Sequence, residues 1–217
     1  MSQDDVRGVP LRYGPIDAGA TIGHVHLKVA DLERALGFYC GILGFELVQR
    51  YGTSAAFISA GGYHHHIGLN TWESHGAPPP PPHTTGLYHV AIKYPRRAAL
   101  ADALRRLVAS GIPLDGASDH GVSEALYLRD PDDNGVELYW DRPEATWPRT
   151  ADGELAMYTR PLNVQALLDL RDERPAARRA AGLSSVLSSS VCRFSGRVNI
   201  ASSPSAVRGH AASGRSQ

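Results

Sequence analysis

Residues 22–44 read IGHVHLKVADLERALGFYCGILG, and this stretch contains the pattern that decides the fold. Apolar and polar residues alternate over 22–29, which is typical of a half-buried strand. Asp31 then stands where a helix N-cap is expected, and apolar residues recur at helical spacing until Gly44, where a helix should stop. The stretch therefore predicts a strand followed directly by a helix.

The same order of elements occurs twice. HVHLK at 24–28 and HVAIK at 89–93 open the two copies, 65 residues apart. The turn sequence DPDDNG at 130–135 separates the last two strands of the second copy. We interpret the pattern as two tandem β-α-β-β-β modules, which makes the fold class α+β. The remaining predicted strands are 45–49, 55–59, 65–70, 126–129 and 136–140, and the second helix is 97–110.

Changes in composition divide the chain into segments. Five consecutive prolines at 78–82 favour stiff polyproline II, so they form a linker between the modules and not a strand or helix. The end of the chain is rich in Arg, Ala, Ser and Gly, which predicts disorder. The expected segments are an arm at 1–20, one domain at 21–147 (modules 21–76 and 85–147 with the linker 77–84), an extension with a short helix at 148–171 and a basic tail at 172–217.

Charge and composition exclude several classes of protein. The 217 residues include 22 basic and 22 acidic side chains, of which 8 and 2 lie in 171–217, so an acidic body precedes a basic tail. This balance argues against a dedicated nucleic-acid binder. Neither a signal peptide nor an apolar run of membrane-spanning length is present, so no membrane partner is expected. Cys40 and Cys192 give no disulfide framework, which favours a reduced, cytoplasmic setting.

Ten histidines are present, and nine of them lie between His24 and His120. In each opening strand the apolar partners should pack beneath the helices, so His24 and His89 point to the opposite, concave face. The same parity places Tyr127 and Glu137 on the concave face of the second module. His75 and His83 lie in or beside the proline-rich linker, where a surface role is the simplest interpretation.

Two imidazoles and one carboxylate on a shared face form the ligand set of a divalent metal such as non-haem Fe(II). From spacing alone, the alternative of two unrelated strand histidines and a surface glutamate stays open. The run His64–His66 adds a candidate ligand or acid/base group, although such a run also occurs in loops. His120 follows Asp119, and that neighbour suggests an oriented imidazole.

Longer motifs point to a family. Residues 22–48 resemble the opening strand–helix–strand of the vicinal oxygen chelate superfamily, which includes glyoxalase I and bleomycin-resistance proteins. GGYHHHIGLNTW, GLYHVAI, DHGVSEALYL and DPDDNGVELYWDRP are together similar to its extradiol ring-cleavage dioxygenases of the catechol 2,3-dioxygenase type. The resemblance covers about 20–150 and implies a half-open mixed β-barrel around a metal site, with the helices outside.

The resemblance also implies roles for individual residues. Three positions match the ligands of Fe(II), for which Mn(II) is the alternative, and three match groups around the substrate. His66 matches the acid/base histidine, and His65 is the alternative in a shifted register. The implied ligands are His24, His89 and Glu137, and the implied pocket groups are His66, His120 and Tyr127.

The activity implied is insertion of O₂ beside the hydroxyls of a catechol, giving a semialdehyde acid. The chain departs from the family in having two modules where these dioxygenases commonly have four, which leaves the substrate in doubt. Strand-exchanged dimers are common in the superfamily, so a homodimer is expected. Three alternatives stay open: a glyoxalase I-like isomerase using Ni or Zn, a non-catalytic binder of the bleomycin-resistance type, and a thiol transferase acting on a fosfomycin-like antibiotic.

Overall fold

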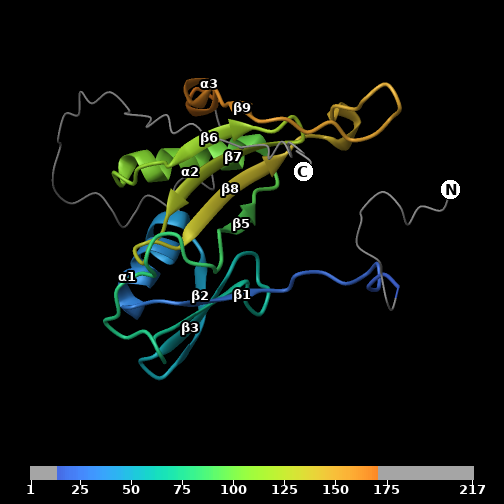
Figure 1. The fold of residues 1–217 in the computed structure, drawn as a ribbon. Coiled ribbons are helices and arrows are strands. Elements are labelled where there is room, and N and C mark those ends of the chain that lie inside the picture. The colour runs from blue at the N-terminus through green and yellow to red at the C-terminus, as the bar shows by residue number, and fades with distance from the viewer. Residues whose placement is uncertain (1–13, 171–217) are drawn as a thin grey trace, which may run out of the picture.

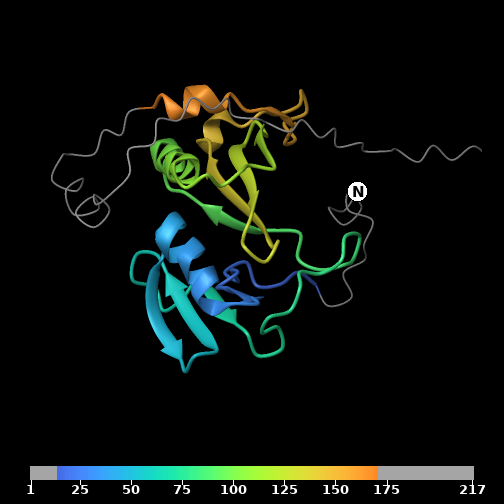
Figure 2. The same ribbon diagram turned by 90° about the vertical axis from the view of Figure 1, so that its left-hand side faces the viewer.

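The computed structural model describes residues 14–170, so the predicted basic tail and the first part of the arm lie outside the described residues. The first module lies below the second in Figure 1, and Figure 2 shows the pair from the side. The elements of the first module are β1 (Val25–Lys28), α1 (Leu32–Leu36), the π-helical segment η2 (Gly37–Leu43), β2 (Glu46–Tyr51), β3 (Ala55–Ser59) and β4 (Ile67–Asn70). Those that follow are β5 (Val90–Lys93), α2 (Arg97–Ala109), β6 (Gly116–Asp119), β7 (Ser123–Arg129), β8 (Gly135–Asp141), η3 (Glu144–Thr146), β9 (Arg160–Pro161) and α3 (Val164–Leu168).

The strand order confirms the internal duplication. The first sheet has the order β1-β4-β3-β2, and the second has the order β5-β8-β7-β6-β9. In both, the opening strand pairs in parallel with the last strand of its module, and the other pairs are antiparallel. The fold is α+β, as predicted. Its two sheets are open and mixed.

The alternation predicted from sequence determines which faces are buried. Leu27 and Val29 are buried, while the alternating residues His26 and Lys28 are exposed. The strands of the second sheet and the inner faces of α1 and α2 contribute to the same apolar cluster, so one core serves both modules. Full burial of each leucine in this cluster contributes roughly 1.5–3 kcal/mol to stability.

The helix signals of the first module are confirmed, with one difference. The Asp31 side chain accepts a hydrogen bond from the amide of Arg34, and Gly44 ends the segment in a left-handed conformation. Between them α1 widens into the π-helical segment η2, which apolar spacing does not reveal.

No helix of residues 14–170 combines the length and the hydropathy that crossing a membrane requires.

The sequence pattern assigns no range to two strands of the second sheet, although the β-α-β-β-β order implies one strand between the second helix and residue 126. β6 has the sequence GASD, which contains no alternation of large apolar residues. β9 has two residues, one of them proline, and it extends the sheet beside β6. Both are held by backbone hydrogen bonds, and these carry little sequence signal.

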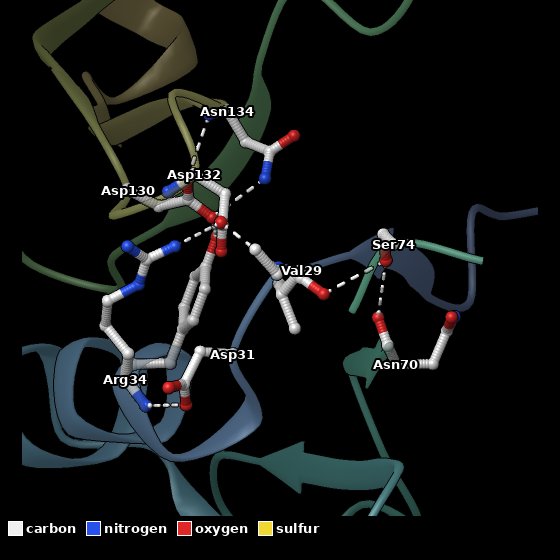
Figure 3. Close-up of polar contacts among 10 residues, drawn as sticks. Val29, Asp31, Arg34, Asn70, Ser74, Asp130, Asp132 and Asn134 are labelled. Carbon is white, nitrogen blue, oxygen red and sulfur yellow. Dashed lines mark hydrogen bonds and ion pairs between the residues drawn. The ribbon is translucent and has the colours of Figure 1, made fainter. Parts of the chain in front are cut away.

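The turn between β7 and β8 joins the two modules (Figure 3). The Asp130 carboxylate accepts hydrogen bonds from the amides of Asp132 and Asn134 and from the Asn134 side chain. Its Oδ2 also accepts the hydroxyl of Tyr39, which is fully buried in the first module, at 3.0 Å. Burial, followed by the charge of Asp130, raises the pKa of Tyr39. The turn is therefore built on a carboxylate that bonds to both modules.

Asp132 makes the second connection across the junction. Its Oδ1 accepts the amide of Ala30 at 3.1 Å and the guanidinium of Arg34 at 2.5 Å. The side chain of Asp132 is 9% exposed and that of Arg34 is 49% exposed. The backbone bond is the better shielded of the two contacts, since Arg34 is half in water.

We expect Tyr39→Phe to lower the free energy of unfolding by roughly 1–3 kcal/mol, because Oδ2 of Asp130 would keep only the Asn134 side chain as a donor and would lose the bond that crosses the module junction. Tyr51→Phe is the matched control, since Tyr51 is 67% exposed, and it should change stability by less than about 0.5 kcal/mol. Denaturant unfolding of the three proteins provides the measurement. Equal stability of the two variants would show that the Tyr39–Asp130 bond does not hold the modules together.

Candidate functional site

The centre of the candidate site is a pair of side chains from neighbouring strands of the second sheet. β5 and β8 run parallel with Ala91 opposite Glu137, and His89 lies one residue before β5. The Nε2 atom of His89 is 2.9 Å from Oε2 of Glu137. These side chains are 31% and 14% exposed, so both are partly shielded from water. An imidazole nitrogen and a carboxylate oxygen therefore meet on one face of the sheet.

Tyr127 and His120 extend this pair along the same face. Tyr127 lies directly opposite Glu137 in the antiparallel pairing of β7 and β8, and its hydroxyl is 3.3 Å from Oε1 of Glu137. Nε2 of His120 is 2.7 Å from the same hydroxyl. Burial, followed by the neighbouring Glu137 carboxylate, raises the pKa of Tyr127. The phenol therefore keeps its proton at neutral pH and can donate it in a hydrogen bond.

A glycine makes the close approach of β5 and β8 possible. Gly135 begins β8, and a Cβ atom there would collide with the carbonyl oxygen of Tyr88 and lie 3.0 Å from Cβ of His89. The obstacle is backbone, which cannot rotate away. Gly135 therefore constrains the position of His89, whereas the sequence pattern indicates only a turn residue there.

The first module holds a separate group of histidines. His24 is exposed, and its ring centroid is 4.4 Å from that of His65. Nδ1 of His64 and Nδ1 of His65 are 2.7 Å apart. Partial burial, followed by the charge of His24, lowers the pKa of His65. His65 is therefore neutral near pH 7, with a nitrogen available to accept a proton.

The side chain of His66 contacts other residues than that of His65. Its Nδ1 is 3.0 Å from Oγ of Ser59 and accepts the amide of Ala60 at 3.3 Å. Its ring also packs against Tyr63. The structure thus brings His65, and not His66, against the predicted ligand His24.

The three predicted metal ligands do not form one group. His89 and Glu137 are in contact, whereas His24 lies against His65. Among residues 14–170, no three or more histidine, cysteine, aspartate or glutamate side chains are arranged to hold a metal ion. Two of the predicted ligands are therefore together, and the third is with another histidine.

The donor set of the pair nevertheless fits a divalent transition metal. One imidazole and one carboxylate are suitable ligands for Fe(II) or Mn(II). Nδ1 of His89 is buried and has no hydrogen-bond partner within the part of the chain that the structure describes. A histidine with a purely structural role normally has such a nitrogen paired, so the orphaned atom favours a ligand role for the ring.

Sequence reasoning missed the groups that hold His120. Its Nδ1 is 3.2 Å from the carbonyl oxygen of Tyr158 and 3.2 Å from Oγ1 of Thr159, both in the extension after the second module. A backbone carbonyl has no sequence signature, so no motif could have identified Tyr158.

A cavity of about 360 Å³ lies away from these residues, at the module junction, where Arg34, His75 and Asp132 are among its lining residues. It is not the candidate site.

Comparison with known proteins gives a family match. The family model described as "Glyoxalase/Bleomycin resistance protein/Dioxygenase superfamily" matches residues 21–138. A catechol-2,3-dioxygenase of Bacillus subtilis (strain 168) is 42% identical over 155 residues, which are 70% of this chain and 53% of that protein. Biphenyl-2,3-diol 1,2-dioxygenase 3 of Rhodococcus globerulus is 32% identical over 120 residues, which are 55% of this chain and 63% of that protein. The chain thus spans between half and two thirds of the length of these curated relatives.

Solved structures support the fold. A glyoxalase/dioxygenase from Nostoc punctiforme superposes with a TM-score of 0.50 and 19% identity, covering 60% of this chain and 98% of that one. At this identity the likeness concerns the architecture alone.

We expect Gly135→Ala to destabilise the protein by roughly 1–3 kcal/mol and to move His89 away from Glu137, since the new methyl group meets backbone. Gly41→Ala is the matched control, because a Cβ at Gly41 meets nothing within 4 Å. Denaturant unfolding and calorimetric titration with a divalent metal measure the two effects. Metal binding as tight in Gly135→Ala as in the control would contradict this role of Gly135.

Proposed function

Because the chain belongs to the glyoxalase/bleomycin resistance protein/dioxygenase superfamily, we propose that it is an Fe(II)-dependent extradiol dioxygenase of a catechol-type aromatic diol. The observation that carries the proposal is the contact of His89 with Glu137, flanked by Tyr127 and His120 on one sheet face. Both relatives are named as dioxygenases of aromatic diols. Their names support an aromatic diol and O₂ as substrates here.

We propose that His89 and Glu137 hold the metal and that His24 is the third ligand. Fe(II), or Mn(II) in its place, would when bound supply a Lewis acid that lowers the pKa of the diol hydroxyls, and a centre for O₂ chemistry. Two neutral imidazoles and one carboxylate leave coordination positions for both substrates. A site that holds both reactants together would make their encounter intramolecular.

The chain's own residues then manage protons and charge. We assign the acid/base role to His65, the alternative to His66, because His65 lies against the ligand His24 and its lowered pKa leaves it neutral. The hydroxyl of Tyr127 keeps its proton and can donate it to negative charge that develops on a substrate oxygen. His120 holds that hydroxyl in place at 2.7 Å.

The site residues argue against the alternatives. A glyoxalase I-like isomerase would have a second carboxylate on the last strand of the first module, and residues 60–72 contain none. A non-catalytic binder has no need of a phenol and an imidazole lined up beside a histidine–carboxylate pair. A thiol transferase would keep the three metal ligands, but it has no use for the His65, His120 and Tyr127 set.

We propose a compartment, an oligomeric state and domain limits as well. We place the protein in the cytoplasm as a homodimer, with one catalytic domain at 21–147 and an extension at 148–171.

Loading the purified chain with Fe(II) without air and adding a catechol should give a yellow product and uptake of one O₂ per ring, measured with an oxygen electrode. Glu137→Ala should abolish iron binding, because it removes a charged ligand. Glu144→Ala, which alters an exposed glutamate of η3, should behave as wild type. Tight binding of Zn or Ni with no oxygen uptake from any catechol would refute the proposal.

His65→Ala and His66→Ala form a matched pair that tests the acid/base assignment. We expect His65→Ala to retain iron and to lose about 10²–10⁴-fold in kcat, which is the usual range for a general acid/base. His66→Ala should keep most of its activity, since its ring packs on Ser59 and Tyr63. Metal analysis and steady-state rates separate the roles. Loss of iron from His65→Ala would make this residue a ligand, and the reverse order of rates would return the role to His66.

A further inference from the structure

The extension after the second module reaches back to the candidate site. β9 pairs with β6 at Asp119 and Ser118, and the Tyr158 amide donates to the carbonyl oxygen of His120 at 3.3 Å. The Leu162 amide donates to the Ala117 carbonyl at 3.1 Å. Figure 1 shows β9 beside β6, with α3 beyond it. The segment containing Tyr158 and Thr159 is therefore fastened to the strand that leads into His120.

The chemistry of its two neighbours determines which nitrogen of His120 carries hydrogen. The carbonyl oxygen of Tyr158, 3.2 Å from Nδ1, can only accept a hydrogen bond. A hydrogen on Nδ1 satisfies that carbonyl and leaves Nε2 as an acceptor. In the substrate-free site the hydroxyl of Tyr127 lies 2.7 Å from Nε2 and 3.3 Å from Oε1 of Glu137, so its single hydrogen is nearer to Nε2 and the carboxylate is the more distant acceptor.

The opposite tautomer would be disfavoured. An Nδ1 without hydrogen would direct its lone pair at the carbonyl lone pairs of Tyr158. The Thr159 hydroxyl, also 3.2 Å from Nδ1, could donate to that nitrogen, but the repulsion from Tyr158 would persist. With hydrogen on Nδ1, both oxygens act as acceptors, and the remaining contact between two acceptors is the longer one, 3.3 Å between the Tyr127 oxygen and Oε1 of Glu137.

The segment around Tyr158 is held from several sides. A Cβ at Gly121 would lie 2.7 Å from the Tyr158 ring, so the ring packs directly on the turn after His120. The Arg160 guanidinium lies 4.2 Å from the centroid of the same ring. The turn is fixed in addition by the Asp119 carboxylate, which accepts the Gly121 amide at 2.8 Å and the guanidinium of Arg142 at 3.0 Å.

We propose that the carbonyl of Tyr158 and the side chain of Thr159 are positioning groups that fix the ring orientation and the Nδ1–H tautomer of His120. In the substrate-free site Nε2 then accepts the hydrogen of Tyr127 and holds the phenol oxygen in place beside Glu137. The catalytic consequence rests on the proposed function, whereas the tautomer itself does not. Both residues lie beyond 21–138, the part that the family model matches.

The test combines nitrogen NMR with kinetics on the full chain. Long-range ¹H–¹⁵N spectra of metal-free protein labelled with ¹⁵N-histidine distinguish the two tautomers, and His120→Gln identifies the signals of His120. Wild type should show hydrogen on Nδ1. Thr159→Val removes one of the two acceptors of Nδ1–H, so it should shift the nitrogen signals of His120 and lower kcat of the Fe(II)-loaded enzyme about three- to tenfold, with little change in KM for the diol.

Two further variants separate positioning from general loss of structure. Thr159→Ser keeps the hydroxyl and should restore both the spectrum and kcat. Thr150→Val removes a hydroxyl of the same extension that accepts the Glu154 amide instead, so it should leave His120 unchanged. Hydrogen on Nε2 in wild type, or a Thr159→Val protein with unaltered His120 signals, would overturn the proposal. An Nδ1–H signal that responds to Thr159→Val in a protein without oxygen uptake would support positioning and count against the dioxygenase function alone.

Discussion

The Asp130 carboxylate is the group on which the arrangement of the two modules depends. It bonds within its own turn and also accepts the buried Tyr39 hydroxyl from the other module. The turn fixes the register of the β7–β8 hairpin, in which Arg129 pairs with Gly135 and Tyr127 with Glu137. A slip of one residue would send Glu137 to the core face and leave Tyr127 without its partner. One turn therefore sets both the module junction and the contact at the centre of the site.

The duplicated fold does not duplicate the chemistry. His24 and His89 occupy equivalent places, each one residue before the opening strand of its module. Ile67 and Val136 each pair with the first residue of the opening strand of their module. Gly68, the next residue of β4, therefore occupies the place that Glu137 has in β8. A Cβ at Gly68 would lie 2.9 Å from ring atoms of His26, so this imidazole fills the space above the glycine. The first module thus has no carboxylate at the equivalent position and presents histidines and aromatic rings instead.

Much of the fold was predictable because it follows from side-chain alternation and capping. Burial of Leu27 and Val29, the Asp31 cap and the Gly44 stop all leave a local signature in the sequence. β6 and β9 do not, since their contribution is backbone hydrogen bonding without an apolar pattern. Within the candidate site, parity puts Tyr127 and Glu137 on one face, where the two side chains are in contact, because they belong to one hairpin. It cannot show that His24 contacts His65 and not the His89–Glu137 pair, because that depends on how two separate sheets pack.

The second sheet differs from the first at its edge, and this difference bears on the site. β2 forms one edge of the first sheet, and all six of its residues are exposed. The equivalent strand β6 is covered by β9, which pairs its backbone groups and removes an open edge. The residues that lead into β9 are the ones that contact Nδ1 of His120. A short strand that protects a sheet edge thus also holds an imidazole of the site, so loosening that edge would loosen His120 as well.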